Sequence, residues 1–123
     1  MRERGFTMIE LMVTLAILAM LVTLAVPRYF ANVSRTKEDV LREDLYVMRD
    51  AIDKYYADKN VYPTLIDDLV TSKYLRGIPV DPFTQSSHSW VVVPATDASQ
   101  GVVSNVQSGA PNMASDGTWL KDW

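Results

Sequence analysis

Apolar side chains are concentrated in one continuous segment near the N-terminus. From Met8 to Val26 the polar residues are Glu10, Thr14 and Thr23, and all the others are apolar. At about 1.5 Å of rise per residue this segment forms roughly 28 Å of helix, close to the roughly 30 Å hydrocarbon core of a bilayer. The pattern therefore predicts a helix that spans a membrane once.

A short polar leader with Arg2 and Arg4 precedes the apolar segment. Its positive charge favours retention of residues 1–5 in the cytoplasm, with the rest of the chain facing outward. A secretory signal peptide has a shorter apolar core and a cleavage site of small residues, whereas this segment ends in Val26-Pro27-Arg28. Pro27 has no amide hydrogen and crowds the preceding turn, so we predict a kink or a local opening of the helix there.

The chain after Pro27 predicts an amphipathic helix that reaches about Lys59. Apolar residues recur there at three- and four-residue steps, which is the period of a helix with one buried face. Charged neighbours such as Arg42 and Arg49 are expected to stay solvated or to meet other subunits. The apolar stripe, which we expect to pack against a small sheet, consists of Leu41, Leu45, Met48, Ile52 and Tyr55.

Turn-forming residues divide the remainder into a short helical turn and two strands. Pro63 and the residues before it end the long helix, and Thr64 followed by Asp67 is typical of a capping box that opens a helical turn. Runs rich in valine at residues 90–93 and 101–106 predict two antiparallel strands. The predicted fold class is therefore α+β, with a long N-terminal helix packed on a small antiparallel sheet.

Composition excludes several classes of function. Lys and Arg total 12 against 15 Asp and Glu, and no basic cluster follows the leader, so nucleic-acid binding is not expected. The chain has no cysteine, and its one histidine, His88, lies in a serine-rich stretch that is typical of a solvated loop. Catalysis needs several polar groups that converge in a cleft. We therefore do not expect an enzyme.

Glu10 is the feature that a simple membrane anchor does not explain, because a carboxylate in an apolar helix costs on the order of 2–3 kcal/mol. If the chain were cut after Gly5, the new α-amine of Phe6 would lie one helical turn from Glu10. In an assembly, the amine of a neighbouring copy could pair with this carboxylate. The alternative is that Glu10 reaches the membrane interface from the end of the helix.

The sequence GFTMIEL at residues 5–11 resembles the prepilin cleavage and methylation motif of type IV pilins and type II secretion pseudopilins. The resemblance implies that a prepilin peptidase cuts between Gly5 and Phe6 and N-methylates Phe6. It also implies that Glu10 sets the registration of subunits during filament assembly, and that the helix can loosen near Pro27 in the filament.

The same resemblance implies a domain organisation and a location. Residues 1–5 form the prepilin leader, residues 6–30 the transmembrane and assembly helix, and residues 31–123 a pilin-like periplasmic or extracellular domain. The implied protein crosses the inner membrane once and has its C-terminal domain in the periplasm. Its implied partners are further copies of itself in a filament, other pilins or pseudopilins, and the assembly machinery of the inner membrane.

Later segments are similar to the major pseudopilin of type II secretion. These segments are Tyr62-Pro63-Thr64, residues 78–83 and residues 115–123. The chain departs from that family at Thr84-Gln85-Ser86, where Gly-Asn-Pro is usual. We therefore expect a structural pseudopilin subunit that serves protein secretion, and the alternatives are a pilin of a type IV pilus and a membrane-anchored binding domain.

Calcium is the one cofactor that the resemblance implies, since major pseudopilins bind one Ca²⁺ near the C-terminus. Asp116 and Asp122 would supply carboxylates, and Ser115 and Thr118 are further candidate ligands, because Ca²⁺ takes about six to eight oxygens. The alternative is that Asp116 and Gly117 form an ordinary turn.

Overall fold

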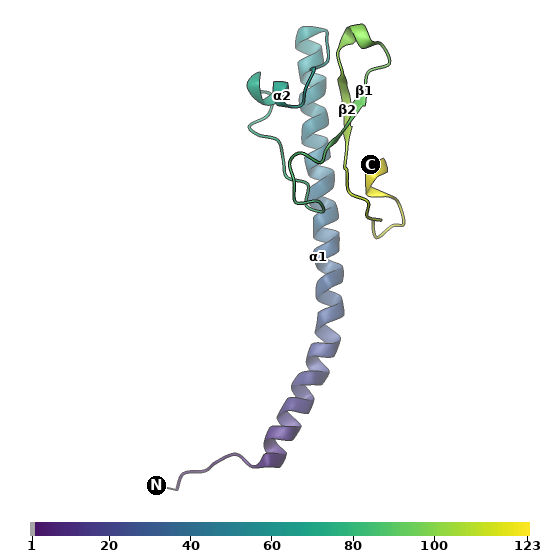
Figure 1. Ribbon diagram of the computed structural model, residues 1–123. Coiled ribbons are helices and arrows are strands. Elements are labelled where there is room, and N and C mark those ends of the chain that lie inside the picture. Colours follow the sequence, from purple (N-terminus) through teal and green to yellow (C-terminus); the bar gives the residue numbers. More distant parts are fainter. Residues whose placement is uncertain (1) are drawn as a thin grey trace. The chain divides into compact units, whose positions relative to one another are not determined.

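The computed structural model describes residues 2–123 and divides into two compact units, one that ends at Ser34 and one from Arg35 to Trp123. One long helix, α1, contributes its first part to the first unit and its second part to the second unit (Figure 1). The elements in chain order are α1 (Met8–Lys59), α2 (Asp67–Thr71), β1 (Val91–Pro94), a 3-10 turn (Ala98–Gln100), β2 (Val103–Gln107) and a second 3-10 turn (Leu120–Asp122). A long N-terminal helix and a small antiparallel sheet confirm the predicted α+β class.

The first part of α1 is apolar and exposed. Its most apolar stretch has a mean hydropathy of 2.5 and is 0% buried, so by length and composition this helix can cross a membrane. The hydroxyls of Thr14 and Thr23 donate to the carbonyls of Glu10 and Ala19 at 2.6 and 2.8 Å, which satisfies both hydroxyls within the helix. The helix continues through Pro27, and the kink expected there stays a prediction.

The second part of α1 provides one wall of the core of the second unit. The predicted stripe is confirmed, because Leu41, Leu45, Met48 and Ile52 are at most 2% exposed and Tyr55 packs against them. The rest of the core comes from α2, the sheet and the C-terminal segment, and it includes Leu69, Trp90, Val103, Val106 and Leu120. The helix ends at Lys59, as predicted, and is followed by Asn60 in the left-handed conformation, with a φ of 56°.

The sheet pairs Val91 with Gln107 and Val92 with Val106, and its antiparallel register shifts before Pro94. The strands predicted at residues 90–93 and 101–106 are confirmed, each displaced toward the C-terminus by one or two residues.

Gly101 accounts for the later start of β2. Its φ is 103°, and a side chain at this position would collide with the carbonyl of Tyr62, so the turn before β2 requires glycine.

The capping box predicted at Thr64 and Asp67 is wrong in detail. The residue before α2, Ile66, makes no side-chain cap. Instead, the carboxylate of Asp68 accepts hydrogen bonds from the N–H groups of Thr64 and Leu65 at 3.0 and 2.9 Å. An acidic side chain does reach back to the loop, but it comes from the next position, where it can bond two N–H groups at once.

Candidate functional site

The predicted processing site lies in the segment before α1. Gly5 and Phe6 have no regular secondary structure, and Phe6 is 92% exposed. A side chain at Gly5 would meet no atom within 4 Å, so the packing of the chain does not demand glycine here. The peptide bond between these residues is accessible, as a peptidase requires. The cleavage itself stays a prediction.

Thr7 and Glu10 form a reciprocal capping box at the start of α1. The N–H of Thr7 donates to Glu10 Oε2 at 3.1 Å, and the N–H of Glu10 donates to Thr7 Oγ1 at 3.2 Å. The box satisfies N–H groups that the first turn of a helix would leave free, and it holds the carboxylate at the positive end of the helix dipole. Sequence reasoning missed this role, although Thr-x-x-Glu before an apolar run is its signature.

Glu10 also faces the processing site. Together with Arg4, Gly5 and Phe6 it lines a hollow of about 410 Å³. The ion pairs formed among residues 2–123 do not include Glu10, so its carboxylate has no cationic partner within the described chain. A carboxylate in this position can accept a bond from the amine of another copy, and the assembly role predicted for Glu10 therefore stays a prediction that this geometry permits.

Asp116, the first residue predicted to bind calcium, is already engaged in other bonds. Its Oδ1 accepts hydrogen bonds from the N–H and the hydroxyl of Thr118 at 2.9 and 2.6 Å, and its Oδ2 lies 3.5 Å from the Arg42 guanidinium. The bonds from Thr118, and after them the charge of Arg42, hold the pKa of Asp116 below its usual value. Gly117 has a φ of 87°, and its N–H donates to the carbonyl of Ala114 at 3.1 Å. These contacts are those of an ordinary turn.

Asp122, the second residue predicted to bind calcium, is exposed in the terminal 3-10 turn. In the part of the chain that the structure describes, no group of three or more His, Asp or Glu side chains is arranged to hold a metal ion. The groups around Asp116 are hydrogen-bond donors and a guanidinium, and they therefore suit a turn within the protein better than a cation site. Calcium binding by Asp116 and Asp122 stays a prediction.

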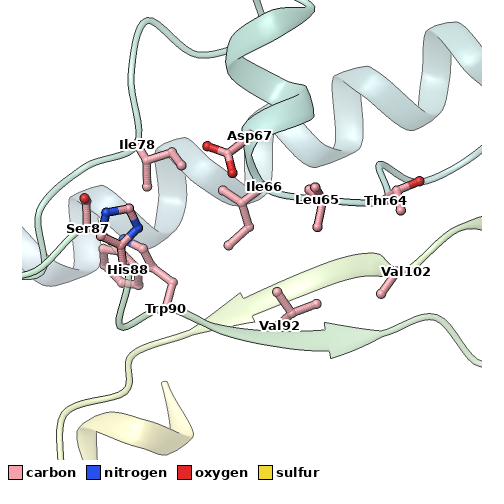
Figure 2. A pocket seen from close by; sticks show the side chains of 10 residues that line it. All are labelled: Thr64, Leu65, Ile66, Asp67, Ile78, Ser87, His88, Trp90, Val92 and Val102. Atoms are coloured by element: carbon pink, nitrogen blue, oxygen red, sulfur yellow. The ribbon is translucent and has the colours of Figure 1, made fainter.

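His88 lies in the lining of a hollow of about 290 Å³ beside the sheet, shown in Figure 2. Its backbone N–H donates to Ser86 Oγ at 3.1 Å. Figure 2 shows the imidazole next to Ser87, and Asp67 is the other ionisable side chain of the lining. Most of the remaining lining is apolar and comprises Leu65, Ile66, Ile78, Trp90, Val92 and Val102. This hollow lacks the set of converging polar groups that catalysis needs.

Comparison with known proteins connects the N-terminal site to a family. Residues 1–26 match the family model of the prokaryotic N-terminal methylation motif. The type II secretion system core protein G of Klebsiella michiganensis is 28% identical to this chain, over 95% of the chain and 93% of that protein. The protein of the same name from Aeromonas hydrophila is 31% identical, over 67% of the chain and 68% of that protein.

The chain is also similar to a protein that is named as a fimbrial protein and not as a secretion protein. Fimbrial protein EcpC of Eikenella corrodens is 32% identical, over 85% of this chain and 69% of that protein. No solved structure matches the chain at a significant level. The similarities thus begin at the methylation motif and continue through the second unit, where the α+β core lies. The chain therefore belongs to the type IV pilin-like family, which includes the major pseudopilin, type II secretion system core protein G.

Proposed function

We propose that this protein is a structural subunit of a type IV pilin-like filament, and specifically a pseudopilin that serves protein secretion by a type II secretion system. The observation that carries the proposal is the first part of α1, an apolar helix whose most apolar stretch contains no buried residue, joined to an N-terminal methylation motif. Similarity to secretion core protein G over most of the chain supports the secretion system as its setting.

The apolar helix needs surroundings that its own chain does not supply. All large apolar side chains from Met8 to Phe30 are at least 41% exposed. Leaving such surface in water costs about 25 cal/mol per Å². In the proposal a bilayer covers the helix before assembly, and the same helices of neighbouring copies cover it in the filament. An apolar surface that is exposed on every side suits a subunit surrounded by several copies.

The residues before α1 give the subunit its processing site and its orientation. A prepilin peptidase would cut between Gly5 and Phe6 and methylate the new amine of Phe6. The basic leader keeps residues 1–5 in the cytoplasm, so the protein crosses the inner membrane once and the second unit lies in the periplasm. The protein has no catalytic role in this proposal.

Assembly then uses the carboxylate of Glu10. The amine of Phe6 on one copy pairs with Glu10 of a neighbour, because opposite charges attract more strongly in an apolar phase than in water. To form this pair, Glu10 exchanges its bond from the N–H of Thr7 for a bond from the amine, or accepts both. Other pilins or pseudopilins and the inner-membrane assembly machinery are the remaining partners that the proposal requires.

The proposal is tested in cells that contain the peptidase and the assembly machinery. Mass spectrometry of the membrane-purified protein should find N-methylated Phe6 as its first residue. The variant Glu10→Ala should be inserted and processed, but electron microscopy of overproducing cells should show few filaments. Glu3→Ala is the matched control, because it removes a carboxylate from the leader that cleavage discards. An intact leader, or wild-type filament numbers with Glu10→Ala, would contradict the proposal.

A second candidate function is that of a pilin in a type IV pilus, which the similarity to fimbrial protein EcpC favours. The two functions differ in what deletion of the gene removes. Loss of a secretion subunit stops the release of exported proteins into the medium, whereas loss of a pilin removes surface fibres. Protein analysis of the medium and negative-stain microscopy of one deletion strain, with and without the wild-type gene restored, separate the two.

A further inference from the structure

The C-terminal segment of the second unit, residues 112–123, has little regular structure to hold it. It contains an isolated β-bridge between Met113 and Trp119, and a short 3-10 turn. Its polar contacts converge on α1, at Glu38, Arg42 and Arg49. Steps of four and seven positions place these residues on one face of the helix. We call these three residues the tail latch.

Glu38 is the buried member of the tail latch, with 8% of its surface exposed. Its Oε1 accepts a hydrogen bond from the N–H of Ser115 at 2.8 Å, and its Oε2 accepts one from the Ser115 hydroxyl at 2.7 Å. A buried carboxylate without such donors would be costly. Both carboxylate oxygens therefore accept a hydrogen bond from the same residue of the C-terminal segment.

Arg49 joins the end of the segment to the sheet. Its Nε donates to Asn105 Oδ1 at 2.8 Å, and one terminal nitrogen donates to the carbonyls of Val106 and Trp123 at 3.0 and 2.7 Å. A single planar guanidinium thus fixes β2 and the last residue against the same position of α1. The expectation that Arg49 stays solvated or meets other subunits is wrong, because its Nε and one terminal nitrogen donate to groups of its own chain.

Arg42 connects the two sides of the segment. Its guanidinium carbon lies 4.4 Å from the centre of the Trp123 ring, as a cation–π contact, and a terminal nitrogen lies 3.5 Å from Asp116 Oδ2. The indole N–H of Trp123 donates to Thr118 Oγ1 at 2.7 Å, and the Thr118 hydroxyl donates to Asp116 Oδ1 at 2.6 Å. Arg42, Asp116, Thr118 and Trp123 therefore form a closed ring of contacts.

These contacts already hold the C-terminal segment on α1 without a bound calcium ion. The carboxylates of Glu38 and Asp116, which lie where the segment meets α1, already accept bonds from Ser115, Thr118 and Arg42. We infer that the tail latch fixes the C-terminal segment by itself, in the role that the family resemblance gives to calcium. The fold of the second unit is then independent of calcium. This inference concerns the second unit alone and does not rest on the proposed function.

The test measures thermal unfolding of the full-length protein in detergent, followed by tryptophan fluorescence, in EGTA and in millimolar CaCl₂. The wild-type protein should have the same Tm in both solutions. Glu38→Gln should lower the Tm by roughly 4 °C or more in both solutions. Glutamine has one acceptor oxygen in place of two and no charge, so one bond from Ser115 is lost and the other is weakened. Ser115→Ala is the milder second variant, and calcium should restore neither. Asp39→Asn, which removes the charge of an exposed carboxylate on the same helix, is the matched control.

A direct measurement of metal binding completes the test. Terbium(III) stands in for calcium, and a tryptophan near a bound ion sensitises its luminescence, so Trp119 and Trp123 serve as built-in reporters. We expect no saturable emission. A calcium-dependent rise in the wild-type Tm, or saturable terbium emission that calcium displaces and Asp116→Asn abolishes, would overturn the inference. A wild-type Tm for both Glu38→Gln and Ser115→Ala would also overturn it.

Discussion

The two parts of α1 share one backbone conformation but differ in what surrounds their side chains. In the first part Ile17 and Leu18 are 54% and 52% exposed, while in the second part Met48 and Ile52 are 0% exposed. The same hydrophobic effect acts on both. The second part satisfies it within its own chain, whereas the first part requires apolar surroundings from outside. Folding of the second unit and burial of the apolar segment are therefore separable properties of one helix.

The largest expected effect comes from the buried part. Ile52→Ala leaves a cavity in the core and should lower the free energy of unfolding of the second unit by about 2–5 kcal/mol. Thermal unfolding in detergent measures the loss. Ile17→Ala is the matched control and should leave the Tm unchanged. An equal loss from both variants would show that the apolar segment also has a core within the chain.

The converse substitution adds charge to the exposed part. Leu18→Arg places a guanidinium near the centre of the apolar segment and should oppose membrane insertion by about 2.5–3.5 kcal/mol. Resistance of the protein to alkaline carbonate extraction from membranes should fall. Val40→Arg is the control, because Val40 is 45% exposed in the second part of α1. If carbonate extracted both variants from membranes to the same extent, the two parts of α1 would not differ in their need for a bilayer.

The two units also differ in how much a hydroxyl group contributes to stability, and this difference is smaller. Ser108 donates to the fully buried carboxylate of Asp81 at 2.5 Å, whereas Thr23 donates to the carbonyl of Ala19 within its own helix. Ser108→Ala leaves Asp81 short of a donor and should cost about 1–3 kcal/mol of unfolding free energy. Thr23→Val should change the Tm little, because the helical N–H still bonds that carbonyl. A large loss with Thr23→Val would contradict this division.

The smallest expected effect is a dependence on pH. Burial, and after it the charges of Asp81 and Glu43, raise the pKa of Asp44 above its usual value. A raised folded-state pKa favours the fold below the unfolded pKa, and this contribution is lost as the pH rises through the folded pKa. Asp44→Asn should therefore raise the Tm at neutral pH by roughly 1–3 °C, since Asp44 is half-buried and solvent partly screens its charge.

The Asp44→Asn difference should shrink toward zero as the pH falls well below about 3.9, the ordinary pKa of an Asp carboxyl, because Asp44 is then protonated in the folded and the unfolded chain alike. Asp39→Asn, an exposed carboxylate on the same helix, provides the control and should leave the Tm unchanged at both pH values. A stabilisation that persisted in acid would have to come from something other than the charge of Asp44.

Short-range patterns made much of the fold predictable from the sequence. The apolar run, the stripe that contains Leu45 and Ile52, and the two valine-rich strands repeat with the period of their own element, so they predict it without knowledge of the rest. The end of α1 at Lys59 was predictable because Pro63 and the residues before it cannot continue a helix. The methylation motif is also local, and it predicted a family that the comparisons confirm.

Polar contacts between distant residues were not predictable in this way. Glu38 and Arg49 lie beside an apolar stripe, where sequence reasoning places charged residues in solvent, and their partners are Ser115 and Asn105 far along the chain. A pattern along one element carries no information about which polar group a second element brings to it. The capping box of Thr7 and Glu10 is different, because its signature is local and could have been recognised.

Arg49 has one further consequence, which concerns aggregation. A sheet of two strands has no interior strand, and free backbone groups along an edge can recruit a strand from another chain. At Val106 in β2 both backbone groups are taken, since its N–H donates to Asn105 Oδ1 at 2.8 Å and its carbonyl accepts from Arg49 at 3.0 Å. An incoming strand would have to displace both bonds at this point. Crowded copies are thereby discouraged from joining their sheets edge to edge at β2.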